Sequence, residues 1–447
     1  MQQSLPVYEE KAMKTALSRA ETVIVLTVFA VCLAGALVIA PAHCPDEHAR
    51  MTLTNGIYEH HSLPTGNEPE TLIRGWGFSY ALRPYLSAMI GAFFMTLFSL
   101  FSQAPRLLLL GSRMGSVLSA TVCCAYCLLL GHRLFRKRSS AILMAVIVCF
   151  LPQVLFLGSF QNNDCLSLAA VTMMLYYLAC GYDDHFSLKT CVKLGTAFSI
   201  GLLSYYSVYG WILMGSIFCV FAVYRDPAIS RKGVFLLRRS LLIAGICLLL
   251  AGWFFIRNAV LHEGDFLGIA SELRMREASR SQGLKLYEMN PARETSLSLF
   301  GFILENGIDW FGTTLRSFIG VFGYLDISLP TVGYILYLLF FAAVIFLYVI
   351  YYRRSKPDRK TRLLFSVMQV SALITLLLSL LASWSRNYQP QGRYVISMIL
   401  LPAFMAARSA DCKAGSSKKS SLAAILSVLW ILMCAFSLIL LLPETLS

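Results

Sequence analysis

Two adjacent carboxylates follow directly on the first long apolar run of the chain. They belong to the polar passage 43–50, His–Cys–Pro–Asp–Glu–His–Ala–Arg, in which Asp46 and Glu47 stand between two imidazoles and a guanidinium. A carboxylate is costly to leave unpaired in hydrocarbon, so both side chains must face water, a partner or a substrate. We interpret the passage as a functional motif, and an ordinary hydrated loop start is the alternative.

Further polar groups lie where other apolar runs begin or end. Asp164 follows Asn163 in a turn barely long enough to reverse the chain, where helix capping is the alternative to function. Arg113 stands at the edge of an apolar run, so its guanidinium either reaches lipid headgroups or binds an anion in a cavity. Arg257 closes one run and Arg393 opens another.

The composition is that of a polytopic membrane protein. Of the 447 residues 57% are hydrophobic and 14% are charged, against about 25% charged in soluble proteins, and mean hydropathy is +0.65. Eleven apolar runs are long enough to cross a hydrocarbon core of roughly 30 Å as helices. We therefore predict an all-α bundle in a single domain, 1–447. The predicted spans are Thr22–Ala40, Arg113–Gly131, Ala141–Leu157, Cys165–Gly181, Thr190–Ser204, Val208–Tyr224, Leu241–Ile256, Val332–Tyr352, Leu363–Ala382, Tyr394–Ala407 and Leu422–Leu442.

The net charge of +14 follows from membrane topology. With eleven spans, 24 of the 38 Lys and Arg residues fall on one side, which the positive-inside rule makes the cytoplasm, together with the N-terminus. The excess charge is therefore no footprint of nucleic acid, and the polar motifs lie on the outer face. The basic clusters lie near 11–19, 133–138, 189–193, 225–239, 353–362 and 408–419.

Three outer segments, 41–112, 258–330 and 383–394, hold the candidate residues. Two apolar stretches within them, 82–101 and 297–320, would invert the charge distribution if both crossed the membrane. We expect them to lie on or partly in the outer leaflet, as interfacial or re-entrant helices. The first span has a basic flank but no convincing small-residue cleavage site, so we expect an uncleaved anchor.

The 13 cysteines lie mostly inside apolar runs and form no secreted disulfide framework. Cys44 and Cys165 differ because both lie beside an acidic residue on the outer side, where a disulfide would tie two acidic loops together. The adjacent His60 and His61 can ligate metal in principle, but neighbouring histidines point in different directions, so we prefer a solvated loop.

The order of the outer-side motifs resembles a bacterial membrane family known as a domain of unknown function, which is similar to the GT-C glycosyltransferases. Protein O-mannosyltransferases and the lipid A aminoarabinose transferase are members of that class. One departure is that the family has a histidine three residues after the Glu, whereas here His48 follows Glu47 directly and Arg50 takes the later place. The motifs are Pro45–Asp46–Glu47, Arg113, Asn162–Asn163–Asp164, Ile256–Arg257–Asn258 with Gly264–Asp265, Ser317–Gly323 and Gln391–Gly392–Arg393–Tyr394.

The resemblance implies that a sugar passes, with inversion, from a polyprenyl-phosphate donor to a glycan, lipid or protein acceptor at the outer face of the bacterial cytoplasmic membrane. On this interpretation Asp46 is the base for the acceptor hydroxyl, and Glu47 and Asp164 orient the acceptor or keep Asp46 ionised. A cationic cradle stabilises the departing phosphate. Its candidates are Arg113, Arg257, Arg393 and Arg83.

The same resemblance suggests further substrate contacts from His48, Arg50, Asn163 and Tyr394. We expect no obligatory cofactor, because a monophosphate donor needs less charge compensation than a diphosphate and arginines are plentiful. A divalent metal that bridges Asp46, Glu47 and Asp164 is the alternative.

Two other classes of function remain open at the level of the sequence. A transporter or flippase of lipid-linked saccharide would have polar groups near the bilayer midplane and repeated halves, which the sequence lacks. A non-catalytic component of envelope polysaccharide assembly would tolerate loss of Asp46.

Overall fold

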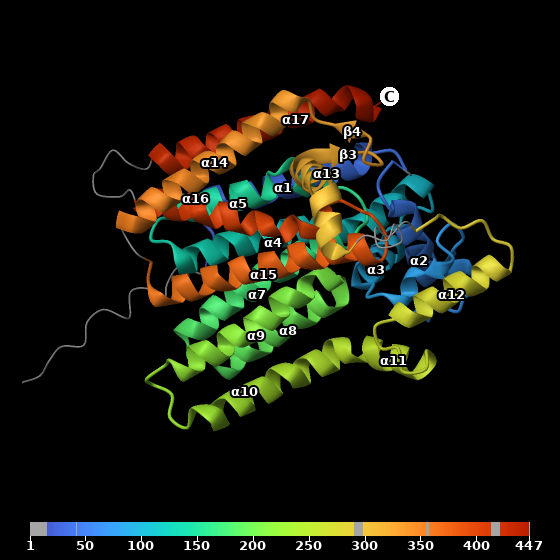
Figure 1. Ribbon diagram of the computed structural model, residues 1–447, viewed down its shortest axis with the longest axis horizontal. Coiled ribbons are helices and arrows are strands. Elements are labelled where there is room, and N and C mark those ends of the chain that lie inside the picture. The colour runs from blue at the N-terminus through green and yellow to red at the C-terminus, as the bar shows by residue number, and fades with distance from the viewer. Residues whose placement is uncertain (1–15, 42, 290–297, 355–356, 413–420, 447) are drawn as a thin grey trace, which may run out of the picture.

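The protein is a bundle of long helices that lie side by side (Figure 1). The computed structural model describes residues 16–41, 43–289, 298–354, 357–412 and 421–446. Within them, nine helices are long and apolar enough to cross a membrane. Strands in this part of the chain are limited to two short antiparallel hairpins, which agrees with the predicted all-α polytopic fold. The strands are β1 (Leu72–Ile73), β2 (Phe78–Ser79), β3 (Val321–Phe322) and β4 (Ile327–Ser328).

The nine helices each coincide with a predicted span, although their ends differ. The helix after residue 231 is longer than predicted, because α10 continues through a π-helical turn into α11. They are α1 (Arg19–Val38), α4 (Pro105–Leu134), α7 (Asp164–Asp183), α9 (Tyr209–Tyr224) with its leading turn η3 (Tyr206–Val208), α10 (Lys232–Cys247) with η4 (Leu248–Gly252) and α11 (Trp253–Leu261), α14 (Thr331–Arg354), α15 (Arg359–Ser385), η6 (Gly392–Ile399) with α16 (Leu400–Cys412), and α17 (Ser421–Leu446).

The other two predicted spans form shorter helices. The run Ala141–Leu157 is divided into α5 (Arg138–Cys149) and α6 (Pro152–Leu157). Pro152 causes the break, because proline has no N–H to donate and forces Leu151 before it into an extended conformation. The run at 190–204 forms α8 (Leu188–Ser204), which has 17 residues.

The outer segments contribute short helices that cap one end of the bundle. The apolar stretch 82–101 contains a helix of 14 residues. Within the stretch 297–320, residues 299–320 form a longer helix that is not among the nine candidate spans. Whether either is interfacial or re-entrant stays a prediction. The elements are α2 (Glu47–His60), η1 (Pro69–Thr71), η2 (Tyr80–Leu82), α3 (Leu86–Ser99), α12 (Ile269–Ser281) and α13 (Leu299–Gly320).

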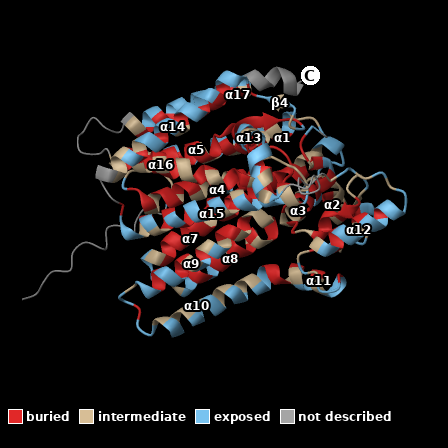
Figure 2. Ribbon diagram, in the orientation of Figure 1, coloured by how far each residue is buried: buried red, intermediate tan, exposed pale blue. Residues whose placement is uncertain are grey.

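The interior of the bundle is built on α4 and α7, which pack against each other. α4 also packs against α1, α3 and α5, so its residues are mostly buried (Figure 2). In contrast, α10 has no buried residue and lies at the edge of the bundle, where its exposed leucines are suited to lipid.

Ion pairs tie several helix ends together at the end of the bundle opposite α2. Glu21, which also forms a capping box with Ser18 at the start of α1, binds the imidazole of His132 at 2.7 Å and Arg138 at 3.2 Å. Asp183 accepts from Lys360 at 2.8 Å. The basic clusters predicted to share one side therefore meet at one end where they are described; parts of the clusters near 11–19, 353–362 and 408–419 lie outside the described residues.

Candidate functional site

The two adjacent acids, Asp46 and Glu47, point toward different arginines. Asp46 has a left-handed backbone, with φ 61°, and stands before the first residue of α2 without capping the helix through its side chain. Its carboxylate instead accepts a hydrogen bond from Arg393 Nη2 at 2.5 Å. Glu47, one residue later, binds Arg113. A helix turns about 100° per residue, so adjacent side chains at its start diverge.

Glu47 and Arg113 form a buried ion pair with a structural role. Arg113 Nε and Nη2 donate to the two Glu47 oxygens at 2.8 and 2.7 Å, and Nη1 donates to the carbonyls of Ala36 and Ile39. Gln161 N–H donates to the same carboxylate at 3.0 Å. Both side chains are buried. Arg113 was predicted to begin its span, but α4 begins eight residues earlier, so Arg113 lies inside the helix. Because this guanidinium has no free edge, we remove Arg113 from the phosphate cradle and Glu47 from the groups that contact the acceptor.

In the ion pair of Asp46 and Arg393, the Asp46 side chain is partly accessible to solvent. The Arg393 side chain is 4% exposed, whereas that of Asp46 is 24% exposed. Burial alone would raise the pKa of the Asp46 carboxyl, but the guanidinium groups of Arg393, Arg50 and Arg83 together hold its pKa below the usual value. The carboxylate therefore stays ionised and open to a ligand, as a general base requires.

Asp164 lies beside this pair, at the first residue of α7. Asn162 performs the local capping task, since its Oδ1 accepts from the Cys165 N–H at 3.0 Å. The Asp164 Oδ2 atom is buried and accepts no hydrogen bond from the described residues. The carboxylate lines a pocket of about 220 Å³ of empty space, which we call the Asp164 pocket, together with Arg393, Tyr394, Ser167, Ser207 and Ser397.

A second cavity lies next to these acids. This cavity, the Arg50 cleft, contains about 340 Å³ of empty space that is partly open to solvent. Arg50 is 9% exposed, its guanidinium lies 5.3 Å from the Tyr80 ring centroid, and its Nε has no hydrogen-bond partner among the described residues. Burial lowers the pKa of Arg83, but Glu272 raises it well above its ordinary value. The residues that line the cleft include Arg50, Tyr80, Arg83, Ser87, Asn163 and Tyr205.

Other predicted site residues have different surroundings. Arg257 donates from Nη1 to the Pro64 carbonyl at 2.8 Å and to the Tyr85 hydroxyl at 2.6 Å, and from Nη2 to the Ala81 carbonyl at 3.2 Å. We therefore assign it to fixing the first outer segment and remove it from the cradle. His48 is exposed on α2, while the buried side of that helix carries Arg50.

Two predicted substrate contacts line the cavities. Asn163 accepts a hydrogen bond from Ser87 and donates to the Pro84 carbonyl at 3.3 Å, so its amide is fixed in the wall of the Arg50 cleft. Tyr394 stacks on Tyr205 with ring centroids 6.2 Å apart. One aromatic pair thus stands between the two cavities, since each ring lines one of them.

Sequence reasoning missed Glu272 and Tyr205. Glu272 binds Arg83 through two hydrogen bonds, but it stands 189 positions away in an ordinary polar helix, and nothing in the spacing pairs the two. Tyr205 is the one residue between the end of α8 and the start of η3, within the sequence Ser–Tyr–Tyr–Ser. The polar break between the apolar runs that form α8 and α9 was the available signal for that residue.

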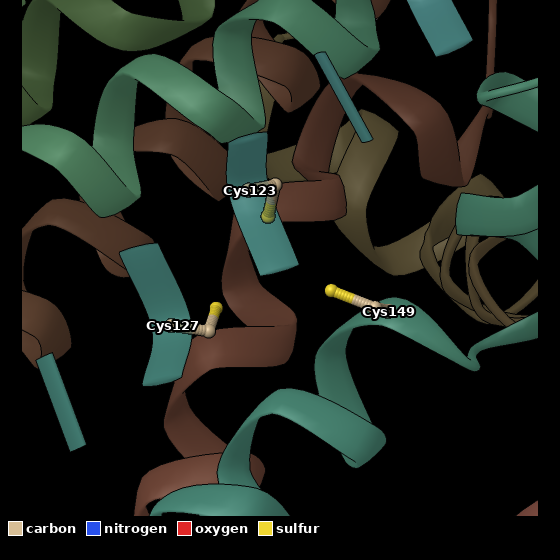
Figure 3. A group of neighbouring side chains, drawn as sticks. All are labelled: Cys123, Cys127 and Cys149. Atoms are coloured by element: carbon tan, nitrogen blue, oxygen red, sulfur yellow. The ribbon is translucent and has the colours of Figure 1, made fainter. Parts of the chain in front are cut away.

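Among the described residues, one group of three ligand atoms is close enough to hold a metal ion, and it lies in the helix interior. The sulfur atoms of Cys123, Cys127 and Cys149 lie within 4.8 Å of one another (Figure 3). All three are buried on α4 and α5, where free cysteine also serves as a small apolar residue. Cys44 and Cys165 are free buried thiols, so the structure does not contain the disulfide considered from the sequence.

The architecture matches solved glycosyltransferases of the GT-C class. The apo crystal structure of ArnT from Cupriavidus metallidurans has a TM-score of 0.53 at 16% identity, over 88% of this chain and 60% of that one. The apo oligosaccharyltransferase of Archaeoglobus fulgidus has a TM-score of 0.55 at 12% identity, over 93% of this chain and 56% of that one. The chain thus spans less than two thirds of the length of either, and at these identities the likeness establishes the fold.

The sequence itself defines the family. Residues 88–402 match the family described as "Predicted membrane protein (DUF2142)", and the chain belongs to it. No curated protein matches the sequence. The resemblance predicted from the outer-side motifs is thereby confirmed at the level of family and fold.

Proposed function

We propose that the protein is a membrane glycosyltransferase that moves a sugar from a polyprenyl-phosphate donor to an acceptor hydroxyl. The observation that carries the proposal is an ionised, accessible carboxylate, Asp46, beside a cleft that holds the guanidinium of Arg50, which forms no ion pair with a described residue. A base and an anion site side by side are the two groups that this reaction needs. The GT-C fold supports the same class of chemistry.

The residues suggest the following reaction. Asp46 removes the proton of the acceptor hydroxyl, and the acceptor oxygen attacks the anomeric carbon of the sugar. The bond between that carbon and the donor phosphate oxygen breaks, and its electron pair leaves with the phosphate. Arg50 stabilises the charge that develops on this oxygen, while Arg393 keeps Asp46 ionised and in place. The products are polyprenyl phosphate and a glycoside of inverted configuration.

The environment of the site fits an outer-face reaction at the bacterial cytoplasmic membrane. The Arg50 cleft lies among the outer segments, and the exposed apolar faces of the bundle offer a surface for the lipid tail. In this proposal the acceptor is a glycan, lipid or protein. No metal is required, because Glu47 is already occupied by Arg113 and leaves only two carboxylates, Asp46 and Asp164, for an ion.

Asp46→Asn tests the proposal in full-length protein that is reconstituted with a polyprenyl-phosphate sugar and candidate acceptors. We expect release of polyprenyl phosphate to fall by about 10²–10⁴-fold, the usual loss when a general base is removed. The matched control is Glu59→Gln on the exposed side of α2, which should retain the parent rate. Transport of the intact donor across liposomes without cleavage would contradict a transferase and favour a flippase.

A further inference from the structure

The arginines at the outer mouth differ in whether they form an ion pair with a carboxylate. Arg113 binds Glu47, Arg393 binds Asp46 and Arg83 binds Glu272. Arg50, in contrast, forms no ion pair with any residue described in the structure, although it is largely buried. Arg257 forms no ion pair either, but its Nη1 donates to a carbonyl and a hydroxyl, while its Nε, like that of Arg50, has no partner among the described residues. The Arg50 cleft therefore contains two guanidinium groups, of which one is already paired.

Glu272 holds Arg83 in the geometry that a phosphate would use. Glu272 Oε1 accepts from Arg83 Nη2 at 2.6 Å, and Oε2 accepts from Nε at 2.9 Å. Two parallel hydrogen bonds to one edge of a guanidinium are also the preferred mode of binding to phosphate oxygens. Glu272 is 6% exposed, so a second anion on this edge of Arg83 would meet a buried carboxylate.

The backbone holds Glu272 firmly in this position. Gly268, which precedes α12, has φ +72°, and a Cβ there would lie 2.1 Å from the carbonyl oxygen of Leu82. The Asn258 amide donates to the same carbonyl at 3.0 Å. Asp265 caps α12 by accepting the Ser271 N–H at 2.7 Å. The start of α12 is thus fixed against the residue that precedes Arg83.

We propose that Glu272 is a specificity-determining residue that restricts the cleft to lipid donors with a single phosphate. The inference rests on the proposed function, since it assumes that a lipid phosphate enters this cleft. The guanidinium of Arg50 is sufficient to bind a single phosphate group. A diphosphate brings a second charged phosphate that needs the Arg83 edge, where the Glu272 carboxylate repels it. Repulsion of the wrong ligand is a common basis of specificity.

The test compares two lipids of equal chain length, polyprenyl monophosphate and polyprenyl diphosphate, for binding to the purified full-length protein in nanodiscs. The parent should bind the monophosphate more tightly. Glu272→Gln keeps the size of the side chain and removes its charge, so the diphosphate should gain affinity by roughly tenfold relative to the monophosphate. Glu263→Gln is the matched control, because Glu263 is an exposed acid of the same outer segment that pairs with Arg274.

An unchanged ratio of the two affinities in Glu272→Gln would overturn the inference. Equal affinities in the parent would overturn it as well, which keeps the test decisive even if the variant fails to fold. Failure of the proposed function would give a different result. The Arg50→Gln variant would then bind both lipids with the same affinity as the parent protein does. If Arg50→Gln weakens both lipids and Glu272→Gln leaves their ratio unchanged, the cleft binds lipid phosphate and only the role of Glu272 is wrong.

Discussion

Asp46 and Glu47 are neighbours in sequence but have separate tasks. Removal of one partner from a buried ion pair costs about 3–5 kcal/mol, so Glu47 is suited to stability and not to moving protons. Asp46 is partly exposed and held by an arginine from the far end of the chain. The sequence predicted that this pair of acids is functional; only the direction of each side chain at the start of α2 distinguishes the proposed base, Asp46, from the structural residue, Glu47.

The pH dependence of the reaction should reflect the arginines around Asp46. A base works only when ionised, and the pKa of Asp46 is lowered in the folded protein, so activity should persist below the pH at which an ordinary carboxylate is protonated. Arg393→Gln removes one lowering charge while the raising effect of burial remains. We expect the acid limb of kcat/KM to move to higher pH in this variant.

The shape of the pH profile separates this effect from a general loss of activity. Arg386→Gln, an exposed arginine in the same outer loop, should leave the acid limb unchanged. If Arg393→Gln lowers the rate equally at every pH, then Arg393 does not set the ionisation of Asp46.

At the level of helices, hydropathy predicts most spans because a helix that crosses a membrane must be apolar over most of its length. The division between α5 and α6 was also readable in principle, since Pro152 stands inside the run. The start of α4 at Pro105 could not be predicted, because the residues before Arg113 are apolar enough for either a span or a helix in the outer leaflet. The contact of Arg83 with Glu272 joins the residue after η2 to α12 through tertiary packing and leaves no periodic signal.

Close approach of two backbones at Gly392 positions Arg393. A Cβ on Gly392 would lie 2.0 Å from the Phe318 backbone nitrogen, and the Gly392 N–H donates to Ser317 Oγ at 2.7 Å. Gly392→Ala should therefore separate η6 from α13 and destabilise the protein by about 1–3 kcal/mol, as overpacking does. A lower melting temperature together with reduced activity is the expected result.

Gly312→Ala on α13 is the matched control for this element. A Cβ at Gly312 meets no atom within 4 Å, so the substitution should be neutral or slightly stabilising in a helix. Equal melting temperatures for Gly392→Ala and the parent would show that η6 does not depend on this contact.

On the scale of the whole molecule, charge is separated between the two ends of the bundle. One end joins the tips of α1, α4, α5, α7 and α15 through ion pairs such as Glu21 with Arg138 and Asp183 with Lys360. The other end holds α2 and α12 (Figure 1). The Arg50 cleft is lined there by residues of α2 such as Arg50, and the Asp164 pocket adjoins it through the Tyr205–Tyr394 pair. A donor that is carried by a lipid needs this arrangement, because its phosphate stays at the membrane boundary while its tail remains in the bilayer.

The orientation of the bundle can be measured with two small epitope tags. An insertion after Ser62, beyond the end of α2, should be labelled by antibody in intact bacterial cells whose outer barrier has been removed. An insertion after Ala228, in the connection between α9 and α10, should be labelled only after the cytoplasmic membrane is permeabilised, because basic loops remain on the cytoplasmic side. Labelling of the tag at 228 without permeabilisation would place the basic end outside, and the reaction proposed for Asp46 would then have to take place on the cytoplasmic face.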